Sequence, residues 1–189
     1  MRISRNVLSR FVDVPRDARR LRDLLDDVGL EVKRVVDRSD DLQLTLELLA
    51  NRGDHHCYKG LATEISGRTG DEVTVPPVFE LTVGDSPIPL RNETPLCGVY
   101  TATLLVRDAI GLGQLEADTI APILGADQGS VSAPVDATNL ANLELGQPTH
   151  AFDADTIVGG ITIRTSRPGE TALPLFAEER VELPEGTIV

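Results

Sequence analysis

PVDATNLANLELGQPTHAFDAD, residues 134–155, joins a polar-capped apolar segment to a loop broken by glycine and proline. Asp136 and Thr138 are residue types that cap helix N-termini, and Gly146 with the proline that follows it is a helix stop signal. The sequence therefore predicts a short helix over residues 137–145, followed by a loop that carries a histidine.

The apolar side of this helix is expected to include a glutamate. At about 100° per residue, Glu144 falls on the same face as Ala137, Leu140 and Ala141, and Asn139 falls on another face. The carboxylate of Glu144 is therefore predicted to point inward. Two interpretations stay open: a glutamate at the rim of the core that backbone N–H groups satisfy, or a polar anchor in a pocket.

The periodicity of the remaining chain predicts both helices and strands. Apolar residues three and four apart predict a helix over residues 16–28, and strict alternation predicts a strand over residues 42–48. A helix capped by Asp54 should bury Tyr58, Leu61, Ala62 and Ile65. Weaker patterns predict strands with loops over 71–95, a strand buried on both faces over 98–107, a helix over 114–124, and strands at 161–165 and 179–183. The fold class is thus α+β, with mixed α/β elements.

The length of 189 residues suits one large domain or two small domains packed closely together. We expect a strand–helix unit at residues 1–40 that packs on residues 41–189 to form one compact body. The first thirty residues are too charged for a signal peptide, and no apolar run is long enough to span a membrane, so a cytoplasmic protein with reduced Cys57 and Cys97 is expected.

Charge is distributed unevenly. Residues 1–38 hold ten Arg and Lys against seven Asp and Glu, a net charge of +3, and residues 39–189 hold eight against twenty-three, a net charge of −15. An acidic body is a poor general surface for nucleic acid, so any RNA contact is expected at the arginine-rich start. The alternative is that these arginines form a solvated helix face.

Residues 51–54, NRGD, lie between a predicted strand and a predicted helix N-terminus, where Arg52 and free N–H groups could receive a carboxylate or phosphate. His55, His56 and Cys57 follow directly, but consecutive ligands point to different sides of a helix and no second Cys/His pair follows at finger spacing. We therefore expect no metal site. Nucleotide-binding and serine-hydrolase motifs are absent from the sequence, and no cofactor is predicted.

Residues 137–155, ATNLANLELGQPTHAFDAD, resemble a segment of the bacterial phenylalanyl-tRNA synthetase beta subunit, including its unusual ELGQPxHAFD string. MRISRNVLSRFVDVP, GLEVKRV and NRGDHHCYKGLATEISGRTG resemble further segments of that subunit in the same order, so the resemblance covers nearly the whole chain. The resemblance implies a B1-like unit and a B3/B4-like editing domain. The inserted OB module has no room here, and segments like the later modules are not found.

In that family the B3/B4 region hydrolyses mischarged tyrosyl-tRNA, so the resemblance implies roles for individual residues. Glu144 and Asn139 would be catalytic, with Glu144 in the editing pocket. Asn51, Arg52 and His150 would lie beside the substrate, with His150 as structural support. The chemistry fits, because splitting an activated ester requires a placed water and oxyanion donors more than a strong nucleophile.

Two departures from the family pattern suggest a reshaped pocket. The family's TLDG aligns with residues 174–177, PLFA, so Pro174 replaces a threonine of the pocket and a carboxylate is lost. The family's NRPD is NRGD here, with Gly53 in place of a stiff proline.

Three functions are compatible with these residues. The first is a free-standing aminoacyl-tRNA deacylase that edits in trans, and the second is a transferase in which a nucleophile other than water attacks the aminoacyl group. The third is a binding module without catalysis for an amino acid or RNA. The expected partners are aminoacyl-tRNA, bound weakly, and a small amino acid or acceptor. The sequence does not indicate an oligomeric state.

Overall fold

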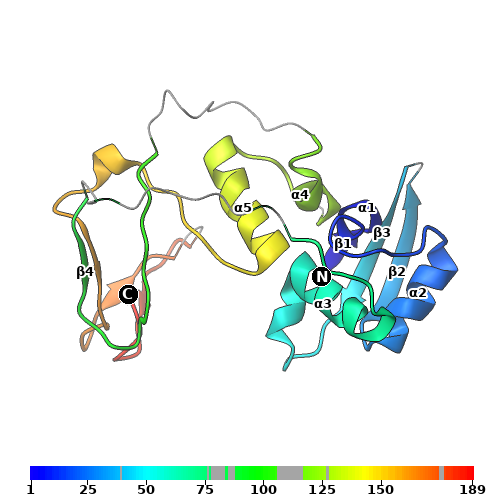
Figure 1. The fold of residues 1–189 in the computed structure, drawn as a ribbon. Helices are drawn as coiled ribbons and strands as arrows, with labels where there is room; N and C mark the ends of the chain where they lie inside the picture. The colour runs from blue at the N-terminus through cyan, green and yellow to red at the C-terminus, as the bar shows by residue number, and fades with distance from the viewer. Residues whose placement is uncertain are drawn as a thin grey trace. The chain divides into compact units, whose positions relative to one another are not determined.

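The computed structural model describes residues 1–38, 40–75, 77, 84, 88–105, 117–126, 128–174 and 177–189. The chain forms two compact units, which are described separately (Figure 1). The first unit comprises Met1–Phe79 and Ile110–Ala151, and the second comprises Glu80–Ala109 and Phe152–Val189. Helices and small sheets are combined within one chain, so the predicted α+β fold class is confirmed.

The first unit is built on a three-stranded antiparallel sheet in the order β1-β3-β2. The strands are β1 (Arg2–Ser4), β2 (Glu31–Arg38) and β3 (Asp41–Glu47). Leu42, Leu44 and Leu46 are buried while their neighbours are more exposed, which confirms the period-two strand predicted over 42–48. The central strand therefore directs one row of leucines into the core.

Helix α2 (Ala18–Asp27) packs against β2 and confirms the helix predicted over 16–28. The carboxylate of Asp17 accepts a hydrogen bond from the N–H of Arg20 at 2.9 Å, which sets the N-terminus. Leu21 and Leu25 are fully buried. The arginines of this helix lie on its outer side, as an amphipathic helix requires.

Helix α3 (Tyr58–Thr69) covers the same core, with its stripe of Tyr58, Leu61, Ala62 and Ile65 fully buried as predicted. Asp54 is not its cap, because residues Gly53–His56 form a 3-10 turn (η1) before the helix begins. Cys57 takes the capping position instead, and its Sγ accepts from the N–H of Gly60 at 3.4 Å.

One hydrophobic cluster unites the sheet with its helices and with the short helix α1 (Arg5–Leu8). Its buried members come from residues 3–32 and from residues 42–65, so the strand–helix unit predicted at 1–40 shares its core with the segments that follow. The predicted boundary near residue 40 lies inside the first unit. That residues 1–40 and 41–189 form one body stays a prediction.

A second, smaller cluster joins α4 (Ala121–Gly125) to α5 (Ala133–Leu145) through Ile120, Ile123 and Leu143, and Met1 packs against it. Both helices lie against the rest of the unit: α4 contacts β1, and α5 contacts α3 (Figure 1).

Helix α5 begins four residues before the predicted start at residue 137. Pro134 fits the first turn of a helix, and Asp136 is not the N-cap. Its buried carboxylate accepts hydrogen bonds from Ser130 Oγ at 2.6 Å and from Val131 N at 2.9 Å, which folds the preceding loop back onto the helix. These hydrogen bonds hold the pKa of Asp136 below its usual value.

Among its described residues, the second unit contains two small sheets and few buried side chains. Strand β4 (Leu90–Asn92) pairs in parallel with β5 (Ile161–Ile163), and β6 (Thr171–Ala172) pairs antiparallel with β7 (Val181–Glu182). A 3-10 turn, η3 (Ala154–Thr156), precedes β5. Strands β5 and β7 fall inside the predicted ranges 161–165 and 179–183, respectively. In the described residues, no helix is long and apolar enough to cross a membrane.

Where the structure describes them, one predicted strand is wrong and one predicted helix is confirmed only in part. Residues 98–105 form no strand and are exposed, so the buried strand predicted over 98–107 is wrong there. The helix predicted over 114–124 is confirmed at residues 121–124 by α4, whereas residues 117–119 form a turn and Pro122 lies in the first turn of the helix. Residues 106–107 and 114–116 lie outside the described residues.

Gly60 allows the 3-10 turn to approach α3. A Cβ at this position would lie 1.7 Å from the carbonyl oxygen of Asp54, whereas a Cβ at Gly67 in the same helix would have nothing within 4 Å. We expect Gly60→Ala to lower the free energy of unfolding by about 1–3 kcal/mol through this clash, and Gly67→Ala to raise it by up to about 1 kcal/mol through helix propensity. Urea denaturation measures both, and equal effects of the two substitutions would contradict the predicted close approach.

Candidate functional site

The NRGD loop closes on itself through Arg52. Its Nε donates to Asp54 Oδ1 at 3.0 Å, and its Nη2 donates to Asp54 Oδ2 at 2.7 Å and to Glu64 Oε2 at 2.5 Å. Glu64 comes from the second turn of α3, so the guanidinium joins the loop to the helix. The Arg52 guanidinium holds the pKa of Asp54 at about 2 and also lowers the pKa of Glu64.

His55 lies beneath this ion pair and is almost fully buried, with Nε2 at 3.3 Å from Glu64 Oε2 and 3.7 Å from Asp54 Oδ2. Asp54, His55 and Glu64 each offer one ligand atom, and these atoms lie within 4.8 Å of one another. Arg52 Nη2 already donates to two of them, so a cation from the chain itself occupies this position. We therefore assign the cluster a structural role.

The C-terminus of α5 packs against the residue that follows η1. Gly146 has a φ of 74°, and a Cβ there would lie 3.0 Å from Cys57 Sγ. Cys57 is also the cap of α3. The two sequence motifs, NRGD at 51–54 and ELGQP at 144–148, are therefore brought together through Cys57, although their starts lie 93 positions apart in the sequence.

Glu144 lies half-buried near the end of α5 and makes no hydrogen bond or ion pair with any residue that the structure describes. Burial raises the pKa of its carboxyl above the ordinary value, and the charge of Arg10 acts in the opposite direction. A carboxylate that is partly desolvated and has no partner is available to a ligand. This is the feature of the first unit that most resembles a binding group.

The predicted apolar face of α5 is only partly correct. Ala137 is exposed, and the buried positions are Ala133, Asp136 and Leu143. The helix starts earlier and is held by Asp136, so its buried stripe is rotated and Glu144 lies at the edge of that stripe.

The other residues named from the sequence lie in different surroundings. Asn139 is half-buried on α5, about 140° around the helix from Glu144. Asn51 and His150 are exposed in the first unit. Pro174 is exposed in the second unit, and residues 175–176 of the segment aligned with TLDG lie outside the described residues.

Sequence reasoning missed Glu64 and Arg10. Glu64 follows the buried Leu61 by three positions on a predicted helix. The face of the helix on which Glu64 lies could have been inferred from the sequence, but its hydrogen bond to Arg52 could not. The charge of Arg10 acts on Glu144 from 134 positions away in the sequence, and no local pattern signals that electrostatic effect.

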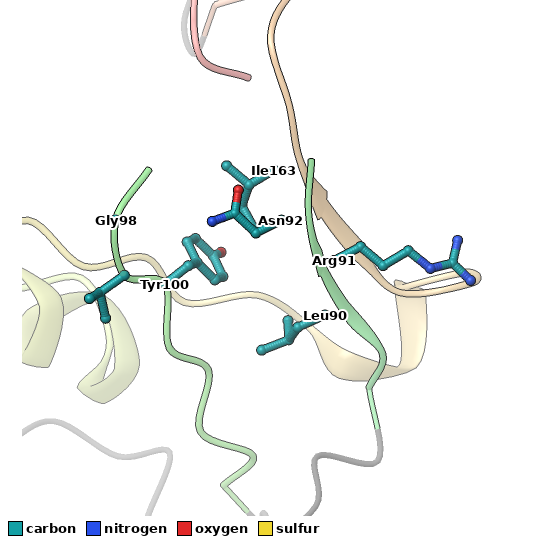
Figure 2. A pocket seen from close by; sticks show the side chains of 7 residues that line it. Leu90, Arg91, Asn92, Gly98, Tyr100 and Ile163 are labelled. Atoms are coloured by element: carbon teal, nitrogen blue, oxygen red, sulfur yellow. The ribbon is translucent and has the colours of Figure 1, made fainter. Parts of the chain in front are cut away.

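The second unit contains a cavity of about 400 Å³ between β4 and the segment that faces it (Figure 2). Its lining consists of Leu90, Arg91, Asn92, Gly98, Val99, Tyr100 and Ile163. Arg91 extends away from the others, and the Asn92 amide is already used by Cys97 O at 2.7 Å and by the N–H of Thr94 at 3.2 Å. The cavity is therefore lined by both apolar and polar groups, and the Arg91 side chain is directed away from the other lining residues.

The raised pKa of Glu144 makes stability depend on pH. The folded state favours the protonated carboxyl of Glu144. The stability that this group contributes is therefore complete below its unfolded pKa of about 4.3 and is lost as pH rises through its higher pKa in the folded state. We expect Glu144→Gln to match the wild type near pH 4 and to be more stable at pH 7 by about 0.5 kcal/mol, a small gain because water screens a half-exposed group. Urea denaturation at both pH values tests this, with the exposed Glu72→Gln as control. A Glu144→Gln protein that is less stable at pH 7 would contradict the prediction.

Comparison with known protein families gives a match for part of the chain. Residues 122–189 match the B3/4 domain family. This range includes α5 and Glu144, together with the C-terminal part of the second unit.

Curated relatives of this chain are phenylalanine–tRNA ligase beta subunits. Phenylalanine–tRNA ligase beta subunits from Ralstonia nicotianae and Synechocystis sp. are 38% and 30% identical over 65% and 74% of this chain. The chain spans only 15% and 18% of the length of these two proteins.

A solved N-terminal fragment of the phenylalanyl-tRNA synthetase beta subunit from Pyrococcus horikoshii aligns with 96% of this chain and 50% of its own, at a TM-score of 0.44 and 18% identity. The sequence matches support the resemblance found from the ELGQPxHAFD string. The chain is therefore related to the N-terminal and B3/4 region of the phenylalanine–tRNA ligase beta subunit.

Proposed function

We propose that this chain is an aminoacyl-tRNA deacylase, in which Glu144 binds the aminoacyl end. The observation that carries the proposal is the half-buried carboxylate of Glu144, which has a raised pKa and no partner among the described residues. It lies within the residues that match the B3/4 family. A partly desolvated carboxylate is a suitable group for the α-ammonium of an aminoacyl ester.

Hydrolysis of such an ester requires little from the protein beyond placement. The oxygen of water attacks the carbonyl carbon, the bond to the ribose oxygen breaks, and the proton of the water passes to that oxygen. Donors that stabilise the oxyanion supply most of the acceleration. His150 is proposed as support for the loop after α5, and Asn139, about 140° around the helix from Glu144, is given no role at the same carbonyl. The reaction as proposed uses no ATP, metal or covalent intermediate.

Arg52 is proposed as a positioning residue. Its guanidinium donates to both Asp54 and Glu64, so a tRNA phosphate would have to compete with two carboxylates. Holding the loop that ends at Cys57 keeps the C-terminus of α5 in place, since Gly146 packs against Cys57. Asn51 is exposed beside Arg52, and we propose that it contacts the terminal ribose.

One departure from the family favours a second candidate, a transferase. PLFA at residues 174–177 lacks the hydroxyl and carboxylate of TLDG, which are groups that can orient water. A site that orients water poorly can still pass the aminoacyl group to an amine or hydroxyl of an acceptor. In that case the new bond forms to the acceptor, whose proton goes to the ribose oxygen.

The net charge of −12 limits the affinity for tRNA. Few phosphate contacts are available to an acidic protein, so binding is proposed to be weak and to involve the arginines of the first 38 residues.

Release of labelled amino acid from a panel of aminoacyl-tRNAs at low salt tests the proposal. We expect wild type to deacylate at least one member, and Glu144→Ala to lower the rate at least about tenfold, as loss of a charged contact does, with folding unchanged by circular dichroism. Glu72→Ala, at an exposed glutamate in the same unit, is the matched control.

Addition of amine and hydroxyl acceptors to the same assay separates transfer from hydrolysis. Transfer without release would replace the deacylase by the transferase. If the protein neither binds nor deacylates any aminoacyl-tRNA, but binds a free amino acid in a Glu144-dependent manner, a small-molecule binding module is the correct function.

A further inference from the structure

We propose that residues 99–105 form a docking strand, through which two copies of this chain pair antiparallel about a two-fold axis at Ala102. The partner is a second copy of the same chain, and the segment lies within the second unit. The inference goes beyond the proposed function and does not depend on it, because no residue of the Glu144 site takes part.

Large apolar side chains gather on this segment and are exposed. Their exposed fractions are 83% for Val99, 40% for Tyr100, 47% for Leu104 and 65% for Leu105. Among the described residues of the second unit, Ile163 is the one apolar residue that is buried. The unit therefore has little core of its own to cover these side chains, and exposed apolar groups that cluster in this way mark an interaction site.

The backbone of the segment is available for pairing. The Asn92 side chain donates to Cys97 O at 2.7 Å, and the Cys97 thiol donates to Val99 O at 3.5 Å, so the start of the segment is anchored. In the described structure, residues 100–105 make no hydrogen bond. Their N–H and C=O groups can therefore pair with another strand, and the valine, tyrosine and threonines of the segment favour the extended conformation that such pairing requires.

The order of residue types is the same in both directions from Ala102. Antiparallel pairing about a two-fold axis joins each residue to the one equally far on the other side of the axis, so such a pair requires a symmetric order. Two threonines flank Ala102, and two large apolar residues follow on each side. The pairs between the two copies are Thr101 with Thr103, Tyr100 with Leu104, and Val99 with Leu105. These are favourable cross-strand pairs, and their symmetry identifies the partner as a second copy.

The segment and the residues before it carry no charge. No Asp, Glu, Lys or Arg occurs from Thr94 to Leu105, whereas the whole chain has a net charge of −12. Two copies repel each other where their acidic surfaces meet, and like charges directly opposite each other destabilise a strand pair. The uncharged segment is therefore a place where two acidic chains can approach.

The cavity beside β4 provides room for one of the new contacts. Figure 2 shows the Tyr100 ring directed toward the face of β4 that carries Leu90 and Asn92, at a cavity of about 400 Å³. Directly opposite residues of an antiparallel pair have Cβ atoms about 4.5–5.5 Å apart. Leu104 of the second copy would therefore lie beside Tyr100 at this cavity, where Leu90 and Ile163 offer apolar contacts.

The area that this pairing buries predicts a weak dimer. Four large side chains that pass from partial exposure into an interface bury on the order of 100 Å² each, so two copies bury roughly 800 Å² before their backbones are counted. Specific interfaces begin at roughly 1,000 Å² in total. We therefore expect a dissociation constant of about 1–100 µM, which analytical ultracentrifugation can measure.

Substitutions at Ala102 test the axis without disturbing the fold, because this residue is exposed. Ala102→Glu places two carboxylates opposite each other in the dimer. Val158→Glu adds the same charge at a residue of the same unit that is 94% exposed, and it is the matched control. Analytical ultracentrifugation over a range of concentrations measures the dimer dissociation constant, and circular dichroism and thermal melting verify the fold of each variant.

We expect the wild type to dimerise, Ala102→Glu to raise the dissociation constant at least about tenfold, and Val158→Glu to behave as wild type. An equimolar mixture of Ala102→Glu and Ala102→Lys should dimerise again, because each carboxylate then meets an ammonium group. Each of these two variants alone should stay mostly monomeric at the same total concentration.

A disulfide tests the register directly. In a Cys97→Ser background, Ala102→Cys brings two thiols together at the axis, where the Cα atoms of an antiparallel pair are about 4.5–5.5 Å apart, a separation that suits a disulfide. Mild oxidation should give a covalent dimer as the main product. Val158→Cys in the same background should stay monomeric, and peptide mass mapping identifies the bond.

A wild type that stays monomeric at about 500 µM, above the expected range of dissociation constants, would overturn the inference. Equal weakening by Ala102→Glu and Val158→Glu would overturn it too, because association would then depend on net charge alone. Larger assemblies in place of dimers, a charge-swapped mixture that fails to dimerise, or a cross-link at residue 158 as efficient as that at residue 102 would each reject the two-fold pairing. The deacylation assay tests the proposed function separately from all of these results.

Discussion

Strand β3 hydrogen-bonds to β1 on one side and to β2 on the other, and the arrangement of the first unit depends on this double pairing. The register places Leu44 opposite both Ile3 and Val35, so the leucines of the strand enter the core between two neighbours. A shift by one residue would turn the same leucines toward water. The pairing also fixes where the strand ends, and thereby where the NRGD loop begins.

The NRGD loop and helix α3 contain charged side chains that neutralise one another near the candidate site. Arg52, Asp54 and Glu64 satisfy one another, and the buried His55 lies against them. Such a closed cluster holds a loop in one conformation but offers little to a ligand. Glu144 is the opposite case, because its carboxylate is partly desolvated and unpartnered in the described structure. The distinction between satisfied and unsatisfied charges is what makes Glu144 the candidate binding group of the first unit.

The relation to the phenylalanine–tRNA ligase beta subunit defines the context of this site without defining its chemistry. The chain matches a small share of those proteins, and it keeps the ELGQP segment at 144–148 while replacing TLDG by PLFA at 174–177. The retained segment forms the end of α5 and its glycine cap, whose packing against Cys57 has a clear physical basis. Packing against Cys57 is therefore one physical reason for the sequence of that segment.

The sequence by itself determined the elements whose periodicity is strong and local. The alternating leucines of β3, the stripes of α2 and α3, and the family signature around His150 could all be read from neighbouring residues, because each pattern repeats within one element. Residues 98–105 show the limit, since a β-branched run becomes a strand only when another strand pairs with it.

Only the tertiary structure decided the contacts that join distant segments. Asp136 binds its preceding loop and starts α5 early, so the predicted apolar face of that helix was rotated. Glu64 captures Arg52, and Arg10 reaches the carbonyl of Asp118 across 108 positions. Such contacts depend on how whole elements pack, and a single long side chain carries no periodic signal that would reveal its partner.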